Sequence, residues 1–288
     1  ENWFEESWFT KHRVKLLGTS SVYRVPTRTI RGTHLDLVVK NCRVGEDEPL
    51  NTHTLQRFMS AEFNSPWEEF ALVMEMGDKQ VGQRIEWVRV QKPLAIYVPP
   101  QKMQLWQSGR SRSKINRIHA RHPGVDLDIL KQYKLVYEWI RGKNLIEIFE
   151  HIRTDIPSLV HHLKRMQAKA FDDLTVKGYH MADMKPEHVI LDEEDCERIE
   201  EKGKGGVNAA ARQVEMIDHL LGVGKYSVID YELFFRTPEH EDQVKASRRH
   251  CYLDDQKCRL DPTPLPSYLT RAEIFGVPYI FGYAESTG

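Results

Sequence analysis

The residues with the clearest chemical potential lie in the segment 183–188, which reads Asp-Met-Lys-Pro-Glu-His. Asp183 is an acid, Lys185 is a cation, and His188 is a possible base or metal ligand. An apolar run follows directly, and a second apolar segment further along the chain ends in Asp230. Two acids presented beside strands, with a lysine between them in sequence, suit a site that holds a metal–phosphate group against a nucleophile.

The overall composition narrows the class of protein. The chain has 288 residues and a net charge of −1, so it can bury a large core in one domain or two lobes. Because the charges nearly cancel, neither a nucleic-acid nor a membrane partner is expected. No apolar run approaches the roughly 20 residues that span a bilayer. The acidic and aromatic start is unlike a secretory signal, and a signal that has already been removed is left open.

The cysteines favour a reducing, cytoplasmic location. Their spacings match no zinc motif, and a chain of this length needs no disulfide scaffold. His250-Cys251 together with Cys258 is the nearest approach to half of a metal site, but we interpret all the cysteines as free thiols. The cysteines are Cys42, Cys196, Cys251 and Cys258.

The front of the chain predicts strands and one helix. Ser65 can cap this helix, Pro66 suits its first position, Glu68 and Glu69 favour its positive end, and Gly77 ends it. The interval 101–132 is the least regular, and we interpret its basic run as a solvated helix face or loop, with a phosphate or RNA contact as the minority interpretation. The predicted strands are 15–17, 22–25, 35–40, 85–90, 94–98 and 134–140, the first two forming a hairpin. The basic residues are Arg110, Arg112, Lys114, Arg117, His119 and Arg121.

The back of the chain predicts mostly helices. The spacing of apolar residues changes from a strand pattern to a helical pattern near Arg141-Gly142, which is the best boundary between two lobes. Helical patterns begin at residues 145, 156 and 209, and Thr237-Pro238-Glu239 reads as a further helix start. A charged stretch, 192–206, precedes the helical pattern that begins at residue 209.

Taken in order, these segments resemble the protein-kinase-like superfamily, which includes protein kinases and the phosphotransferases related to aminoglycoside and choline kinases. The resemblance runs from about Leu16 to Glu232, and its catalytic loop is the most specific part; the chain would be a divergent member. Residues 17–23 resemble the nucleotide-covering loop, 38–40 the strand with the phosphate-binding lysine, 135–142 the hinge, 183–188 the catalytic loop and 229–232 the metal-binding acid.

The resemblance implies an α+β, bilobal fold. Residues 1–140 would form an N-terminal, nucleotide-binding lobe with an antiparallel sheet, one main helix and a basic insert near 101–132. Residues 141–288 would form a mostly helical catalytic lobe with a truncated end, because few residues follow Glu232 compared with a protein kinase.

The resemblance also implies the residues that bind ATP. Lys40 would reach the α- and β-phosphates, and Glu69 would hold it in place, with Glu68 and Glu62 as alternatives. The loop is poor in glycine, so side-chain hydroxyls would replace some backbone contacts. The remaining cofactor-binding residues would be Gly18, Ser20 and Ser21 in the loop and the backbone at Glu138 and Ile140 in the hinge, behind Tyr137 as the gate.

The same resemblance assigns the chemistry. Asp183 would orient the attacking hydroxyl, Lys185 would steady the γ-phosphate, and Asp230 would bind Mg²⁺. Protein kinases place Asn where this chain has His188. Imidazole is a poorer ligand for Mg²⁺ and a better one for Mn²⁺, so either ion is expected. A packing role for His188 is equally open.

We therefore expect an ATP-dependent kinase that transfers the γ-phosphate to a hydroxyl acceptor, which would be a small molecule, a lipid or a protein. The alternative is a pseudokinase-like scaffold that binds nucleotide with little turnover, and transfer of AMP is a third possibility. All three hypotheses require Lys40, Asp183 and Asp230 to face one cleft.

Overall fold

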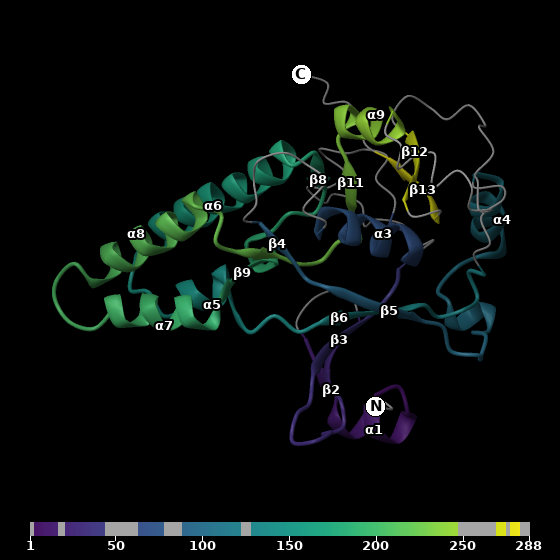
Figure 1. Ribbon diagram of the computed structural model, residues 1–288, viewed down its shortest axis with the longest axis horizontal. Helices are drawn as coiled ribbons and strands as arrows, with labels where there is room; N and C mark the ends of the chain where they lie inside the picture. The colour runs from purple at the N-terminus through teal and green to yellow at the C-terminus, as the bar shows by residue number, and fades with distance from the viewer. Residues whose placement is uncertain are drawn as a thin grey trace. The chain divides into compact units, whose positions relative to one another are not determined.

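The chain is an α+β protein with an antiparallel sheet near its N-terminus and most of its helices later (Figure 1). It divides into two compact units, here called the sheet unit (1–75, 92–139 and 231–288) and the helix unit (76–91 and 140–230). Among the helices that the structure describes, none is long and apolar enough to cross a membrane. The structure, a computed structural model, describes residues 3–16, 21–43, 63–77, 88–121, 128–246, 269–274 and 277–282.

The sheet unit is built on a five-stranded antiparallel sheet that contains five of the predicted strand regions. Lys40 lies opposite Val22 on one neighbouring strand and Leu135 on the other, so it is in the interior of the sheet. The strand order is β1 (Val14–Lys15), β2 (Val22–Pro26), β3 (Asp36–Asn41), β6 (Lys134–Glu138) and β5 (Pro93–Tyr97). The predicted hairpin of β1 and β2 is confirmed.

Both faces of β3 are covered, which explains why a lysine near its end is buried. Val39 packs with Phe9 of α1 (Glu6–His12), a helix that the sequence patterns did not predict. Side chains alternate along a strand, so Lys40 projects from the opposite face. There it contacts Glu69 of α3 (Pro66–Gly77). Strand β3 is therefore packed between two helices.

Helix α3 begins and ends where the sequence predicts. The Ser65 amide donates to Glu68 Oε2 at 2.5 Å, and the Glu68 amide donates to Ser65 Oγ at 3.2 Å. This reciprocal pair is a capping box, which satisfies two amides that the first turn leaves without helical partners. Because the cap uses the Glu68 carboxylate, Glu69 is the acid of this turn that faces the sheet.

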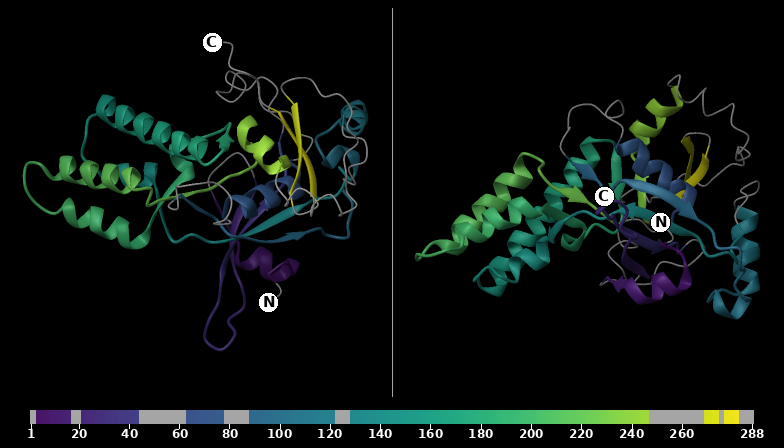
Figure 2. Two further views of the ribbon diagram at one scale, coloured as in Figure 1. Left: turned by 45° about the horizontal axis from the view of Figure 1, so that its top comes forward. Right: turned by 60° about the horizontal axis from the view of Figure 1, so that its bottom comes forward.

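Among its described residues, the helix unit combines a small sheet with four α-helices. Gly142 approaches the backbone so closely that an added Cβ would lie 1.9 Å from the Leu191 carbonyl oxygen, so only glycine fits. The sheet order is β4 (Arg89–Val90), β10 (Ser227–Val228), β9 (Val189–Asp192) and β7 (Gly142–Asn144). The helices are α5 (Leu145–Phe149), α6 (Ile156–Val176), α7 (Glu193–Lys202) and α8 (Ala209–Gly222), the last three forming a group (Figure 2).

The predicted helices in this unit are present, and α7 is an addition. It lies in the charged stretch in which we predicted no helix. Its buried residues are Asp195, Cys196 and Ile199, so only two apolar side chains mark its buried face among many charged residues. Residues 85–87 of a predicted strand lie outside the described residues.

The basic interval 101–132 contains a short 3-10 helix, η1 (Leu105–Gln107), and the helix α4 (Arg112–Arg121). Arg112, Arg117 and His119 are exposed, as expected for a solvated helix face. Arg110 corrects that interpretation, because it is buried and donates to the Ile129 carbonyl at 3.1 Å.

The remaining elements are short. The predicted helix start at Thr237 is confirmed, because its hydroxyl accepts from the His240 amide at 3.3 Å at the beginning of α9 (Pro238–Ala246). Cys42 and Cys196 are free thiols, whereas His250, Cys251 and Cys258 lie outside the described residues. The short elements not yet described are β8 (Tyr179–Met181), η2 (Pro186–His188), β11 (Phe234–Arg236), β12 (Leu269–Ile274) and β13 (Val277–Gly282).

A buried charge network ties α3 to β11 and α9 inside the sheet unit. Arg236 is fully buried and binds Glu75 through two nitrogens, one of them at 2.7 Å from Oε1. It also donates to Glu241 at 2.8 Å. His240 Nε2 lies 3.1 Å from Glu75 Oε1. Bidentate guanidinium–carboxylate pairs of this kind are among the stronger polar contacts in proteins.

We expect Arg236→Ala to lower the free energy of unfolding by about 3–5 kcal/mol, because it leaves the buried Glu75 and Glu241 carboxylates without their cation. Urea denaturation followed by tryptophan fluorescence measures the change. The matched control is Arg165→Ala, which removes an exposed ion pair with Asp218 and should cost less than about 1 kcal/mol. Equal losses in the two variants would contradict the role of the network.

Candidate functional site

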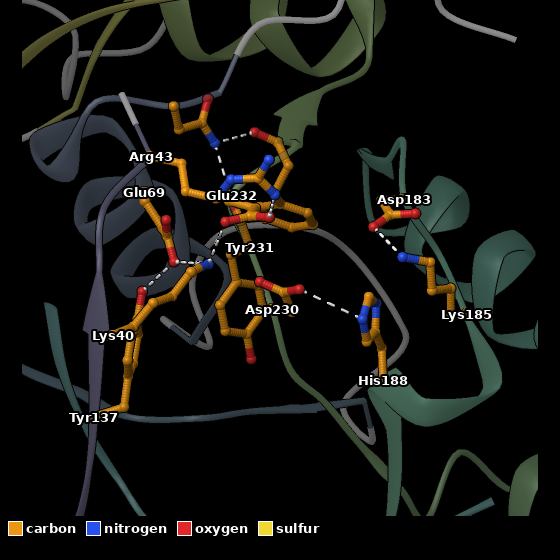
Figure 3. Close-up of polar contacts among 12 residues, drawn as sticks. Lys40, Arg43, Glu69, Tyr137, Asp183, Lys185, His188, Asp230, Tyr231 and Glu232 are labelled. Atoms are coloured by element: carbon orange, nitrogen blue, oxygen red, sulfur yellow. Dashed lines mark hydrogen bonds and ion pairs between the residues drawn. The ribbon is translucent and has the colours of Figure 1, made fainter. Parts of the chain in front are cut away.

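Lys40 lies at the centre of a buried polar cluster in the sheet unit (Figure 3). Only 3 % of its surface is exposed. Its Nζ lies 3.1 Å from Glu69 Oε1 and 3.5 Å from Glu232 Oε2. The predicted pairing of Lys40 with Glu69 is thus confirmed. Glu62, the third alternative for this partner, lies outside the described residues.

Tyr137 adds a second donor to Glu69. Its hydroxyl donates to Glu69 Oε1 at 2.8 Å, and both residues are buried. Burial and the Glu69 carboxylate raise the pKa of the Tyr137 hydroxyl well above its usual value. Burial and the same carboxylate raise the pKa of the Cys42 thiol. The hydroxyl and thiol therefore stay protonated, and Glu69 is held by donors on two sides.

Two further members of this cluster, Arg43 and Glu232, were not predicted from the sequence. Arg43 NH1 lies 3.3 Å from Glu232 Oε1, and its guanidinium stacks 4.2 Å from the centre of the Phe63 ring. Arg43 follows the end of β3, where strand alternation no longer predicts the direction of a side chain. Glu232 was noted only as part of the segment after Asp230, and its contact with Lys40 has no local sequence signal.

In the helix unit, Asp183 and Lys185 contact each other directly. Lys185 Nζ lies 2.5 Å from Asp183 Oδ2. The loop is anchored from α6, because the Gln167 side-chain amide donates to the Met184 carbonyl at 2.6 Å. Burial acts to lower the pKa of Lys185, but the hydrogen bond to Asp183 and the charges of Asp183, Asp230 and Glu187 outweigh it and raise the pKa. Lys185 is therefore a permanent cation at neutral pH.

The antiparallel pairing of β9 and β10 brings His188 to Asp230. Val189 is paired with Val228, and the Ile229 amide donates to the His188 carbonyl at 3.0 Å. Beyond this point, His188 Nε2 lies 3.4 Å from Asp230 Oδ2. Asp230 has a φ of 69°, a left-handed conformation that is uncommon outside glycine. Such backbone strain often occurs at functional sites.

The donors here can be compared with the needs of a divalent cation. No group of three or more His, Cys, Asp or Glu side chains that could hold a metal occurs among the residues that the structure describes. Mg²⁺ is usually bound by one or two carboxylates together with substrate phosphates and water. The partly exposed Asp230 carboxylate fits that pattern. His188 Nδ1 is buried and has no hydrogen-bond partner within the described residues, and Nε2 is the ring nitrogen that faces Asp230.

Only some of the residues predicted for the nucleotide-covering loop and the hinge belong to the described part of the chain. Gly18 and Ser20 lie outside the described residues, whereas the main-chain carbonyl of Ser21 accepts from the Asn41 amide at 3.1 Å. The Glu138 amide donates to the Lys92 carbonyl at 3.0 Å, so this donor is used within the protein. Ile140 is half-buried and begins the second segment of the helix unit.

Comparison with known proteins adds no family. A scan of protein-family models and a search of curated proteins each found no match to this chain.

We expect Asp183→Asn to lower the pKa of Lys185, because burial would no longer be opposed by the Asp183 hydrogen bond and charge. NMR titration of the Lys185 side chain, assigned with Lys185→Arg, measures this pKa. Asp218→Asn, in an exposed ion pair of the same unit, should leave it unchanged. A pKa in Asp183→Asn at or above that of the wild type would contradict the assignment.

The sign of the accompanying effect on stability follows from linkage. Because folding raises the pKa of Lys185, its charged form stabilises the fold fully below the unfolded-state pKa of about 10.4. That contribution is lost as the pH rises through the higher folded-state pKa.

Proposed function

We propose that this chain is an ATP-dependent phosphotransferase that moves the γ-phosphoryl group to a hydroxyl acceptor. The observation that carries the proposal is the buried ion pair of Lys40 and Glu69, reinforced by Tyr137. A buried lysine held in one orientation by a carboxylate is suited to bind an anionic group, because little side-chain freedom is lost when the anion arrives.

The roles of the other residues follow from phosphoryl-transfer chemistry. Asp183 accepts a hydrogen bond from the acceptor hydroxyl and orients it, and its carboxylate is partly exposed as this role requires. Lys185, with its raised pKa, neutralises charge on the transferred group. Asp230 would hold Mg²⁺ or Mn²⁺, with His188 beside it. The bound ion would neutralise the charge of the phosphates.

The acceptor is a hydroxyl of a small molecule, a lipid or a protein. The free thiols of Cys42 and Cys196 are consistent with a reducing compartment, and we propose a cytoplasmic location.

A second candidate function is a nucleotide-binding scaffold with little turnover. The contact between His188 Nε2 and Asp230 Oδ2 favours it, because imidazole beside the carboxylate competes with Mg²⁺. In protein kinases an asparagine stands at the position of His188. The difference between the two functions is therefore whether nucleotide binding is followed by chemistry.

We expect Asp183→Asn to lower the rate of ATP turnover by about 10²- to 10⁴-fold, the usual contribution of a positioned base. ATP affinity should change little, because Asp183 is assigned to the acceptor. ADP release with a panel of hydroxyl compounds measures turnover, and calorimetry measures binding. Asp218→Asn is the matched control and should behave as the wild type. Wild-type turnover in Asp183→Asn would refute the assignment.

A separate measurement distinguishes the two candidate functions. For the phosphotransferase, ATP with Mg²⁺ or Mn²⁺ raises the melting temperature and ADP appears, and His188→Asn should increase the rate with Mg²⁺ relative to Mn²⁺. For the scaffold, the melting temperature rises but neither the wild type nor His188→Asn releases ADP. The absence of both signals would count against nucleotide binding altogether.

A further inference from the structure

The carboxylate of Glu232 is held by two cations from the end of β3. Its Oε2 lies 3.5 Å from Lys40 Nζ and its Oε1 lies 3.3 Å from Arg43 NH1. The Glu232 residue is 5 % exposed, so these charges interact with little screening by water. Two cations that converge on one planar anion form a binding arrangement that phosphate oxygens could also satisfy.

Two carboxylates lie close to the Lys40 ammonium group, although one is enough to fix the orientation of the side chain. Glu69 already contacts Lys40 at 3.1 Å and is itself fixed by Tyr137 at 2.8 Å. Glu232 is the second carboxylate on the same ammonium group. A phosphate group that approached Lys40 would meet the negative charge of Glu232, which disfavours binding while that side chain is in place.

The backbone that carries Glu232 is firmly anchored by Asn64. The Asn64 amide donates to the Glu232 carbonyl at 2.8 Å. The Asn64 side chain donates to the carbonyls of Tyr231 at 3.1 Å and Phe234 at 2.7 Å. Because these contacts involve only main-chain oxygens, the Glu232 side chain can rotate away from Lys40 without breaking them.

We propose that Lys40 and Arg43 together form a phosphate-binding site for the nucleotide, and that the Glu232 carboxylate fills this site until a phosphate group displaces it. The inference rests on the proposed phosphotransferase function and adds two features to it. Arg43 becomes a second ligand of the nucleotide phosphates, and Glu232 becomes an internal competitor that sets nucleotide affinity.

A purely structural role for Glu232 predicts the opposite effect of its removal on the affinity for anions. If Glu232 served only to neutralise Lys40 and Arg43, its removal would weaken the cluster and would not strengthen binding of an anion. If it is a competitor, its removal leaves the cluster one unit more positive, and anions bind more tightly. The direction of the change in affinity therefore separates the two roles.

The test compares binding of ATP and of inorganic pyrophosphate by calorimetry to the wild type, Glu232→Gln and Arg43→Gln. We expect Glu232→Gln to bind both probes about tenfold more tightly, and Arg43→Gln about tenfold more weakly, the scale of one charge-assisted contact. Glu200→Gln, which removes an exposed carboxylate paired with Lys143, is the matched control and should bind as the wild type.

Circular dichroism checks that each variant is folded. If Glu232→Gln does not fold, Glu232→Asp keeps the charge, withdraws it from Lys40 by one methylene, and should also tighten binding. Unchanged or weaker binding in the folded Glu232 variant overturns this inference alone, provided the wild type binds ATP. Absence of ATP binding by the wild type and all variants overturns both this inference and the proposed function.

Discussion

The burial of the Lys40 ammonium group is the constraint on which the sheet unit depends. An unpaired charge inside a protein costs several kcal/mol, so this lysine is tolerated only where carboxylates reach it. Glu69 reaches it from α3, and Glu232 reaches it from the segment before β11. One cation thus fixes the positions of three parts of the chain that are distant in sequence.

In the helix unit, backbone pairing performs the organising role that charge has in the sheet unit. The antiparallel register of β9 and β10 fixes Val189 opposite Val228, so the residues just beyond each strand must meet. His188 and Asp230 are those residues. The segment that carries Asp183 and Lys185 is further held by Gln167 of α6, which donates to the Met184 carbonyl. Main-chain pairing therefore brings His188 and Asp230 together, and one side-chain amide holds the backbone between Asp183 and Lys185.

Local patterns predicted a large part of this structure. The strands of the first sheet and the start of α3 follow from alternation and capping, which act over a few residues. Helix α7 was not predicted, because its buried face includes the charged Asp195. The choice between Glu68 and Glu69 was available from the sequence, since Ser65 followed by Glu68 is a capping-box pattern. The contacts of Arg43 and Glu232 were not available, because they join residues far apart through tertiary packing.

The left-handed backbone of Asp230 limits which residues can occupy that position. Asparagine and glycine tolerate a φ of 69°, whereas β-branched residues strongly disfavour it. A carboxylate at this position is thus one substitution away from a neutral amide of nearly the same shape. Loss of charge there would leave the main chain undisturbed, so the same architecture accommodates either a charged or a neutral side chain at this position.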